Sequence, residues 1–282
     1  MSFLINTLLS LIFAFNLQAA YHSGNILSLE DCKNTYGPSD LSLYVYSIKP
    51  EFELLNNQAD IGRPIASLTK LMTALVFLDT KVNWQENYTI VREDNIKGGR
   101  LNLFLGDTLT IEELFKTALI ASDNGATVAL VRSTGLSEAD FVSRMNEKAK
   151  EMALVNTKFV DTTGLSNYNL ASAKDVASLA KVAFFRPEIR AAISQSKYHY
   201  VTKEGREKNI ISTVDLLDSN LEEFSYLAGK TGYTDEAGYC LVSLFSKDDK
   251  EIISVVLGAL EREARVNVSL DLARWRYQAC PL

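Results

Sequence analysis

Three short motifs that carry groups used in acyl transfer occur in one order along this chain of 282 residues. They are Ser67-Leu68-Thr69-Lys70, Ser122-Asp123-Asn124 and Lys230-Thr231-Gly232. The Ser-x-x-Lys spacing alone selects nothing, because it recurs at 178–181 and 194–197. Only the copy at Ser67 has a polar Ser-x-Asn triplet and then Lys-Thr-Gly downstream. This order indicates a serine acyl-transfer enzyme that works without histidine.

The first motif brings a base close to a nucleophile. Lys70 follows Ser67 by three residues, so both side chains lie on one face of a helix that we expect over 67–78, with Ser67 as its N-cap. A lysine with an ordinary pKa of about 10.4 cannot accept a proton near neutral pH, so burial and a second cation, which we expect to be Lys230, must lower the pKa of Lys70. The predicted helix is apolar on nearly every side, which favours burial over an ordinary cap beside a solvated lysine.

The second motif follows the apolar run Ala118–Ala121, at a place where polar side chains interrupt a buried segment. We expect Ser122 to relay a proton to the leaving amine and the Asn124 amide to hold a backbone group of the substrate. A plain helix cap in a polar turn is the alternative for this triplet taken alone.

The third motif ends a predicted strand. Because Gly232 has no side chain, an extended peptide can approach the backbone there and pair as an added strand. Lys230 and Thr231 would then hold a carboxylate of the substrate. The backbone amides of Ser67 and Tyr233 are the expected oxyanion-hole donors, a contribution of about 3–4 kcal/mol per donor.

Composition excludes several other classes of function. With 29 Lys and Arg against 35 Asp and Glu, the net charge is −6, and no basic cluster resembles a nucleic-acid-binding surface. The two histidines, His22 and His199, are not placed like a triad base and have no metal-ligand spacing. We therefore expect no metal and no cofactor, and interpret both histidines as structural or surface residues.

The start of the chain predicts export. Leu8–Phe15 is an apolar run of the length found in signal peptides, and Ala19 and Ala20 supply small residues for cleavage. Polar residues interrupt the stretch, which is shorter than the roughly 20 apolar residues of a spanning helix. We expect residues 1–20 to be a cleaved signal peptide, with no stable membrane anchor afterwards.

The three cysteines leave two arrangements open. In an exported protein, Cys32 and Cys280 could form a disulfide that joins the ends of the mature chain. Alternatively all three are free thiols, with Cys240 buried in a strand.

Periodicity along the chain predicts an α+β fold, in which a five-stranded antiparallel sheet built from both ends of the chain is covered by helices from the middle. Strands are expected at Leu43–Ile48, Glu51–Leu55, Glu223–Lys230, Tyr239–Phe245 and Ile252–Leu257. Helices are expected at 67–78, Glu112–Ala121, Glu138–Leu154, Ala173–Phe184 and Glu263–Tyr277. With no repeat and no linker after the leader, residues 21–282 are interpreted as a single domain with a mainly helical part.

From Ile61 onward the chain resembles the low-molecular-weight penicillin-binding proteins, the serine D-Ala-D-Ala peptidases. Beyond the three motifs, the resemblance rests on the segments Pro64–Ala74, Phe159–Leu165 and Gly229–Asp235. It implies a β-lactamase/DD-peptidase-like fold and a periplasmic enzyme that acts on peptidoglycan peptides and is inhibited covalently by β-lactams. It also implies Ser67 as the acylated nucleophile, Lys70 as base, Ser122 and Asn124 as a second wall, and Lys230, Thr231 and Gly232 as a third.

Two details favour the DD-endopeptidase branch, which cleaves D-Ala-to-diaminopimelate cross-links. Pro64–Ser67 reads Pro-Ile-Ala-Ser where carboxypeptidases tend to have Asp-Pro-Ala-Ser, and Ala259 and Leu260 stand where many carboxypeptidases have an arginine. Asp123, in the middle of the second motif, instead resembles class A β-lactamases.

Three alternatives remain beside the endopeptidase. The first is a D-Ala-D-Ala carboxypeptidase with the same mechanism. The second is a class A β-lactamase, which needs a deacylating Glu-x-x-Leu-Asn loop that Glu151–Asn156 matches only approximately. The third is a non-catalytic β-lactam sensor.

Overall fold

The computed structural model describes residues 41–95, 98 and 102–279. The predicted signal peptide 1–20, together with His22, Cys32 and Cys280, lies outside the described residues. Cys240 is a buried free thiol in a strand, as one of the two cysteine interpretations expects.

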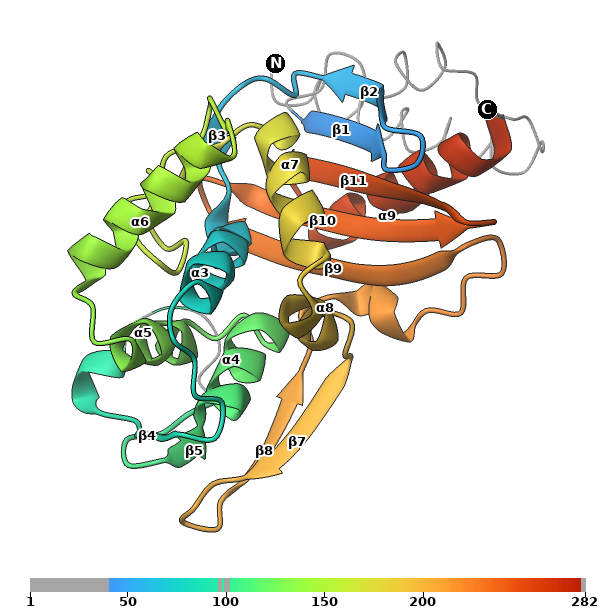
Figure 1. Ribbon diagram of the computed structural model, residues 1–282. Helices are drawn as coiled ribbons and strands as arrows, with labels where there is room; N and C mark the ends of the chain where they lie inside the picture. The colour runs from blue at the N-terminus through green and yellow to red at the C-terminus, as the bar shows by residue number, and fades with distance from the viewer. Residues whose placement is uncertain (1–40, 96–97, 99–101, 280–282) are drawn as a thin grey trace, which may run out of the picture.

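A five-stranded antiparallel sheet with the strand order β2-β1-β11-β10-β9 forms the centre of the molecule (Figure 1). Its strands are β1 (Ser42–Ser47), β2 (Phe52–Asn57), β9 (Ser225–Thr234), β10 (Gly238–Lys247) and β11 (Lys250–Ala259). All five strands correspond to predicted ones, so the expected sheet from both ends of the chain is confirmed. Strand β9, which carries the third motif, lies at one edge.

Alternation along the strands buries both faces of the sheet, because successive side chains of a strand point to opposite sides. Tyr44, Val242 and Val255 belong to a large core shared with the central helices. Their neighbours Val45 and Leu241 belong to a smaller core, shared with the C-terminal helix. The sheet is therefore a middle layer between two sets of helices, which is the α+β arrangement expected from the sequence.

Helix α7 packs on one face of the sheet and α9 on the other, whereas α4, α5 and α6 lie beside the sheet as the expected mainly helical part (Figure 1). The helices are α3 (Thr69–Leu78), α4 (Ile111–Ile120), α5 (Asn124–Ser133), α6 (Glu138–Glu151), α7 (Ala173–Phe184), α8 (Pro187–Ile193) and α9 (Arg262–Arg274). A π-helical turn, Trp275–Ala279, continues α9. Helices α5 and α8 do not appear among the predicted helices.

Side-chain caps fix where several helices begin. Thr110 and Glu113 form a reciprocal capping box at the start of α4. Asp123, Ser137 and Ser172 accept hydrogen bonds from backbone amides at the starts of α5, α6 and α7. The cap at Asp123 matters for function, because it stands inside the second motif.

Short elements connect the layers. Three two-stranded sheets pair β3 (Arg63–Pro64) with β6 (Leu170–Ala171), β4 (Asn87–Thr89) with β5 (Thr108–Thr110), and β7 (Lys197–Val201) with β8 (Glu207–Ile211). The 3₁₀ turns are η1 (Ala66–Leu68), η2 (Arg92–Asp94) and η3 (Asp215–Asp218). The polar run around His199 is thus a strand of the β7–β8 hairpin, with the imidazole exposed. Within the part of the chain that the structure describes, no helix is long and apolar enough to cross a bilayer.

Candidate active site

The nucleophile and base of the first motif lie where the 3₁₀ turn η1 runs into helix α3. The Nζ atom of Lys70 lies 3.0 Å from the Oγ atom of Ser67, which is partly exposed, whereas Lys70 is 1% exposed. The expectation that Ser67 caps the helix is wrong. The cap residue is Leu68, which offers no side-chain bond, and Ser67 lies inside the preceding turn. The Ser67 hydroxyl is therefore left to Lys70 rather than committed to the backbone.

Two further oxygen atoms surround the amine of Lys70. Its Nζ atom lies 2.6 Å from Oδ1 of Asn124 and 2.6 Å from the carbonyl oxygen of Thr163. A carbonyl and an amide oxygen can only accept hydrogen bonds. A neutral amine has two hydrogens and one lone pair, so it can satisfy both of these acceptors and present its lone pair to the hydroxyl of Ser67. This is the arrangement that a general base requires.

Burial lowers the pKa of Lys70 to about 7, and the negative charges of Asp123 and Asp161 partly oppose that shift. The lowered pKa expected from the sequence is therefore confirmed with burial as its cause, but the charge of Lys230, the second expected cause, is not among the interactions that act on Lys70. For Lys230, burial also comes first, and the charges of Lys70 and Arg265 lower its pKa further, to well below the ordinary range. The charge of a protonated Lys70 therefore favours the neutral form of Lys230.

The second motif turns the chain between α4 and α5. Ser122 has a φ of +57°, a conformation uncommon for residues other than glycine, and the Asp123 cap begins α5 directly after it. This bend directs Ser122 toward the sheet, where Lys230 Nζ donates to Ser122 Oγ at 2.7 Å. The Nδ2 atom of Asn124 donates to the carbonyl of Gly98 at 3.0 Å, which leaves Oδ1 for Lys70.

The third motif lies on the edge strand β9. Lys230 is 1% exposed and Thr231 is 5% exposed, and the Thr231 hydroxyl donates to Oγ1 of Thr213 at 2.6 Å. Behind the strand, the buried guanidinium of Arg265 on α9 donates to the carbonyl of Gly232 at 3.3 Å. The absence of an arginine at 259–260 therefore does not leave the third motif without a guanidinium group.

Gly232 also has a role that the sequence does not reveal. A Cβ atom at this position would lie 2.7 Å from the carbonyl oxygen of Ile65 and 3.1 Å from the backbone nitrogen of Ser67. The absent side chain thus lets the nucleophile turn pack directly against β9. This packing brings the amide of Ser67 beside the strand that carries Tyr233, the other expected oxyanion-hole donor.

The loop Asp161–Leu165 is part of the site, although its residues are absent from the sequence-based site. The carboxylate of Asp161 accepts hydrogen bonds from the amides of Thr163, Gly164 and Ser166 at 2.6–2.7 Å. Thr73, one turn after Lys70, donates to the carbonyl of Thr162. The loop therefore presents the Thr163 carbonyl to Lys70. The segment belongs to the stretch Phe159–Leu165 that resembles the serine D-Ala-D-Ala peptidases, but no spacing rule connects it to Lys70.

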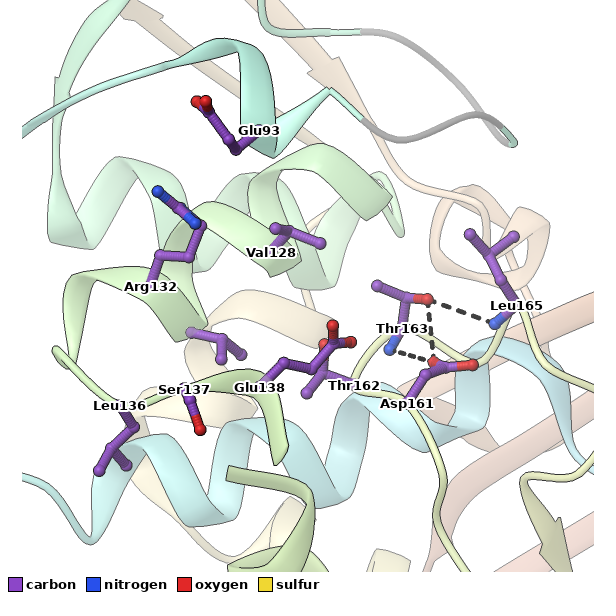
Figure 2. A pocket seen from close by; sticks show the side chains of 11 residues that line it. Glu93, Val128, Arg132, Leu136, Ser137, Glu138, Asp161, Thr162, Thr163 and Leu165 are labelled. Atoms are coloured by element: carbon purple, nitrogen blue, oxygen red, sulfur yellow. Dashed lines mark hydrogen bonds between the residues drawn. The ribbon is translucent and has the colours of Figure 1, made fainter. Parts of the chain in front are cut away.

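A cavity of about 380 Å³ borders the same loop (Figure 2). Figure 2 shows Glu138 and Arg132 on one side of it and the loop on the other. It is lined by Glu93, Val128, Val131, Arg132, Leu136, Ser137, Glu138, Asp161, Thr162, Thr163 and Leu165. None of the residues of the three motifs lines this cavity, so we place the reacting centre at the motifs and not here.

The structure thus brings the predicted side chains into one site made of two hydrogen-bonded groups: Lys70 with Ser67 and Asn124, and Lys230 with Ser122. Thr231 and Gly232 adjoin it on β9. A class A β-lactamase would need Glu151 as its deacylating base, but Glu151 is exposed at the end of α6. The carboxylates whose charges act on Lys70 are those of Asp123 and Asp161.

This fold and this site define a serine acyl-transfer enzyme of the penicillin-binding type. Residues 53–261 match the sequence profile of the D-alanyl-D-alanine carboxypeptidase family of peptidases, and the chain belongs to that family. It is 37% identical over 203 residues to a D-alanyl-D-alanine endopeptidase of Haemophilus influenzae, covering 71% of this chain and 68% of the relative. It is 34% identical over 241 residues to a D-alanyl-D-alanine carboxypeptidase of Bacillus subtilis, covering 81% of this chain and 60% of that relative.

Solved structures agree with this assignment. A DD-transpeptidase of Streptomyces superposes with a TM-score of 0.76 at 26% identity, covering 83% of this chain and 95% of the other. A penicillin-binding protein of Listeria monocytogenes in its cefotaxime-bound form gives a TM-score of 0.73 at 31% identity, covering 84% and 96%. The predicted family, the fold class and the prediction of a serine DD-peptidase are confirmed.

Proposed function

We propose that this protein is an exported DD-peptidase that forms an acyl-enzyme at Ser67 and prefers to cleave D-Ala-to-diaminopimelate cross-links of peptidoglycan. The observation that carries the proposal is the 3.0 Å contact between the Ser67 hydroxyl and the buried amine of Lys70. The other two neighbours of that amine are acceptors only, so a neutral Lys70 has its lone pair available for one proton, that of Ser67.

In the acylation step, Lys70 takes the hydroxyl proton while Ser67 Oγ attacks the D-Ala carbonyl carbon. The amides of Ser67 and Tyr233 stabilise the oxyanion that develops. Ser122, which accepts a hydrogen bond from Lys230, delivers its hydroxyl proton to the leaving amine as the peptide bond breaks, and the proton that Lys70 took from Ser67 replaces it, so Lys70 is neutral again before water attacks. Water then hydrolyses the ester at Ser67 and releases the shortened peptide.

The edge of β9 provides the binding surface for an extended peptide. An edge strand has backbone groups on its outer side without strand partners, so a peptide can add to the sheet there. Lys230 and Thr231 meet the carboxylate of the leaving group, and Asn124 holds a backbone group of the acyl part. The same surface accounts for covalent inhibition by β-lactams, which present a strained amide to Ser67.

The proposed preference for a cross-link depends on the residues that face the leaving group of the substrate. Leu260 follows the end of β11 and is 91% exposed. The strand register places it at the same end of the sheet as Thr234, two residues beyond Gly232. An apolar residue at this rim provides no cation for a free terminal carboxylate. The similarity to the Haemophilus endopeptidase supports the same choice.

A D-Ala-D-Ala carboxypeptidase is the second candidate, and the position of Arg265 favours it. The guanidinium lies behind Gly232 and lowers the pKa of Lys230, so it adds positive potential where a terminal carboxylate would bind. Similarity to the Bacillus carboxypeptidase points the same way.

Competition between two substrates distinguishes the two activities. Equal amounts of a cross-linked muropeptide dimer and a pentapeptide monomer are supplied to the mature protein, and initial rates of cleavage are compared. We expect faster cleavage of the dimer, no cleavage by Ser67→Ala, and a shift toward the monomer in Leu260→Arg. Faster release of D-Ala from the monomer by the unmodified protein would assign it to the carboxypeptidases.

Export is tested separately. Residues 1–20 are proposed to direct the chain to the periplasm and to be removed there. Fractionation followed by N-terminal sequencing should find the mature protein in the periplasmic fraction and beginning close to residue 21. A protein that keeps Met1 in the cytoplasm would contradict this assignment.

A further inference from the structure

A buried ion pair outside the three motifs links the β7–β8 hairpin to the turn before β5. The carboxylate of Asp107, which is fully buried, accepts from Lys208 at 2.6 Å and also pairs with Arg206. The side chain of Lys208 is 5% exposed, whereas that of Arg206 is 43% exposed. Asp107 therefore has one buried and one half-exposed cationic partner.

Lys208 reaches beyond this pair toward the second motif. Its Nζ atom donates to the backbone carbonyl of Asn102 at 2.9 Å. Asn102 in turn donates to Oδ2 of Asp123 twice, from its backbone nitrogen at 3.0 Å and from Nδ2 at 2.8 Å. The other oxygen of Asp123 caps α5 by accepting from the amide of Ala126 at 2.8 Å. One oxygen of this carboxylate thus binds Asn102, and the other caps α5.

The position of Asp123 determines the positions of both its neighbours. Ser122 holds a φ of +57°, a strained conformation that a residue other than glycine keeps only where its surroundings fix it, and it must meet Lys230. Asn124 must present its oxygen to Lys70. A carboxylate anchored at both oxygens supplies the fixed point between the two.

We propose that Lys208 is a positioning residue for the second motif, acting through Asn102 and Asp123 on Ser122 and Asn124. This inference rests on the proposed function of the second motif and adds to it a residue about 80 positions away in the sequence. Lys208 itself touches neither Ser67 nor Lys70 among the contacts of the described residues.

The two cationic partners of Asp107 provide a matched pair of variants. Lys208→Met keeps most of the side-chain volume and leaves Asp107 paired with Arg206, so no buried charge loses all its partners. Arg206→Met removes the other half of the same ion pair but does not touch Asn102. A purely structural role predicts that each variant lowers the urea midpoint but leaves the acylation rate of the folded protein unchanged, whereas the positioning role predicts that Lys208→Met, and not Arg206→Met, slows acylation.

The experiment measures the second-order rate constant for acylation by a fluorescent penicillin, with urea unfolding of each variant to establish that it is folded. We expect Lys208→Met to lower the rate constant by about tenfold or more, because small displacements of catalytic groups are costly. Arg206→Met should remain within about twofold, and Lys208→Arg should restore most of the rate because arginine can donate to both acceptors.

A double-mutant cycle tests the route. Asp123→Ser keeps a cap for α5 but is too short to reach Asn102. In that background, Lys208→Met should have less than about a twofold further effect, because the link is already broken. Independent, multiplying effects would overturn the route, and equal rates for Lys208→Met and Arg206→Met would overturn the proposal.

Two further outcomes have a defined meaning. If Lys208→Met does not fold, Lys208→Gln replaces it, since glutamine can donate to Asp107 but is too short to reach the Asn102 carbonyl as well, and an unchanged acylation rate there overturns the proposal. If the unmodified protein is not acylated at all, the proposed function fails rather than the role of Lys208.

Discussion

Gly164 lies so close to Ala66 that a Cβ atom on Gly164 would come within 2.0 Å of the Ala66 carbonyl oxygen. The same atom would lie 2.8 Å from the backbone nitrogen of Ser67. Gly164 has a φ of +87°, and Ala66 has a φ of +46°. The loop that carries Thr163 and the turn that carries the nucleophile therefore contact each other backbone to backbone, which is possible only without a side chain at this position.

Substitution of Gly164 should consequently be far more damaging than substitution of a glycine that shares only its conformation. Gly135 has a φ of +76° but nothing within 4 Å of an added Cβ atom. We expect Gly135→Ala to lose about 1–2 kcal/mol from left-handed strain alone. Gly164→Ala adds a backbone overlap to that strain, so it should unfold at clearly lower urea and lose acylation. Equal urea midpoints for the two variants would contradict this account.

Replacement of Lys70 by arginine tests the base. Arginine keeps a positive charge but does not deprotonate in proteins. Since the proposed step needs a neutral amine, Lys70→Arg should lower the acylation rate constant by at least about 100-fold, the lower end of general-base contributions. Stopped-flow or gel-based labelling with a fluorescent penicillin measures it, with Ser67→Ala as the unlabelled control. A rate near that of the unmodified protein would place the base elsewhere.

The pH dependence of acylation follows from the pKa of Lys70, which is about 7. Below that pH the amine is increasingly protonated, so the rate should fall by about tenfold per pH unit, and above it the rate should level off. Labelling between pH 5 and 9 (about two units either side of the pKa) measures the profile, with urea unfolding at each pH to exclude loss of structure. A rate independent of pH across this range would show that no proton leaves Lys70 at the proposed pKa.

The lowered pKa of Lys70 should also make the free energy of unfolding depend on pH, without any substrate. The folded-state pKa of Lys70 lies below the ordinary value of about 10.4 in the unfolded chain, so the unfolded state binds more protons between these two values. The free energy of unfolding should therefore rise with pH across this window, relative to Lys70→Met, by up to about 1.4 kcal/mol per pH unit. Urea titrations of both proteins at several pH values measure the difference. A constant difference would mean that the folded-state pKa is not lowered.

The sequence by itself determined the strands, most of the longer helices and the members of the three motifs. Strands β1, β10 and β11 were visible as short apolar runs between turn residues, because both faces of the sheet are buried. The motifs were visible because each keeps its reactive groups within four consecutive residues. Local spacing is enough to recognise such groups.

Only the tertiary structure decided which groups surround them. Three residues outside the motifs contact them through backbone groups: Thr163, Arg265 and Asn102. The position of a backbone group depends on the fold, so the residue type does not predict these contacts. Ser67 is not at the predicted cap position but inside the turn before α3. That turn packs closely against Gly232 and Gly164, and this packing determines its shape. The pKa of Lys70 likewise depends on burial by segments from the whole chain, so the chemistry of this lysine is a property of the fold.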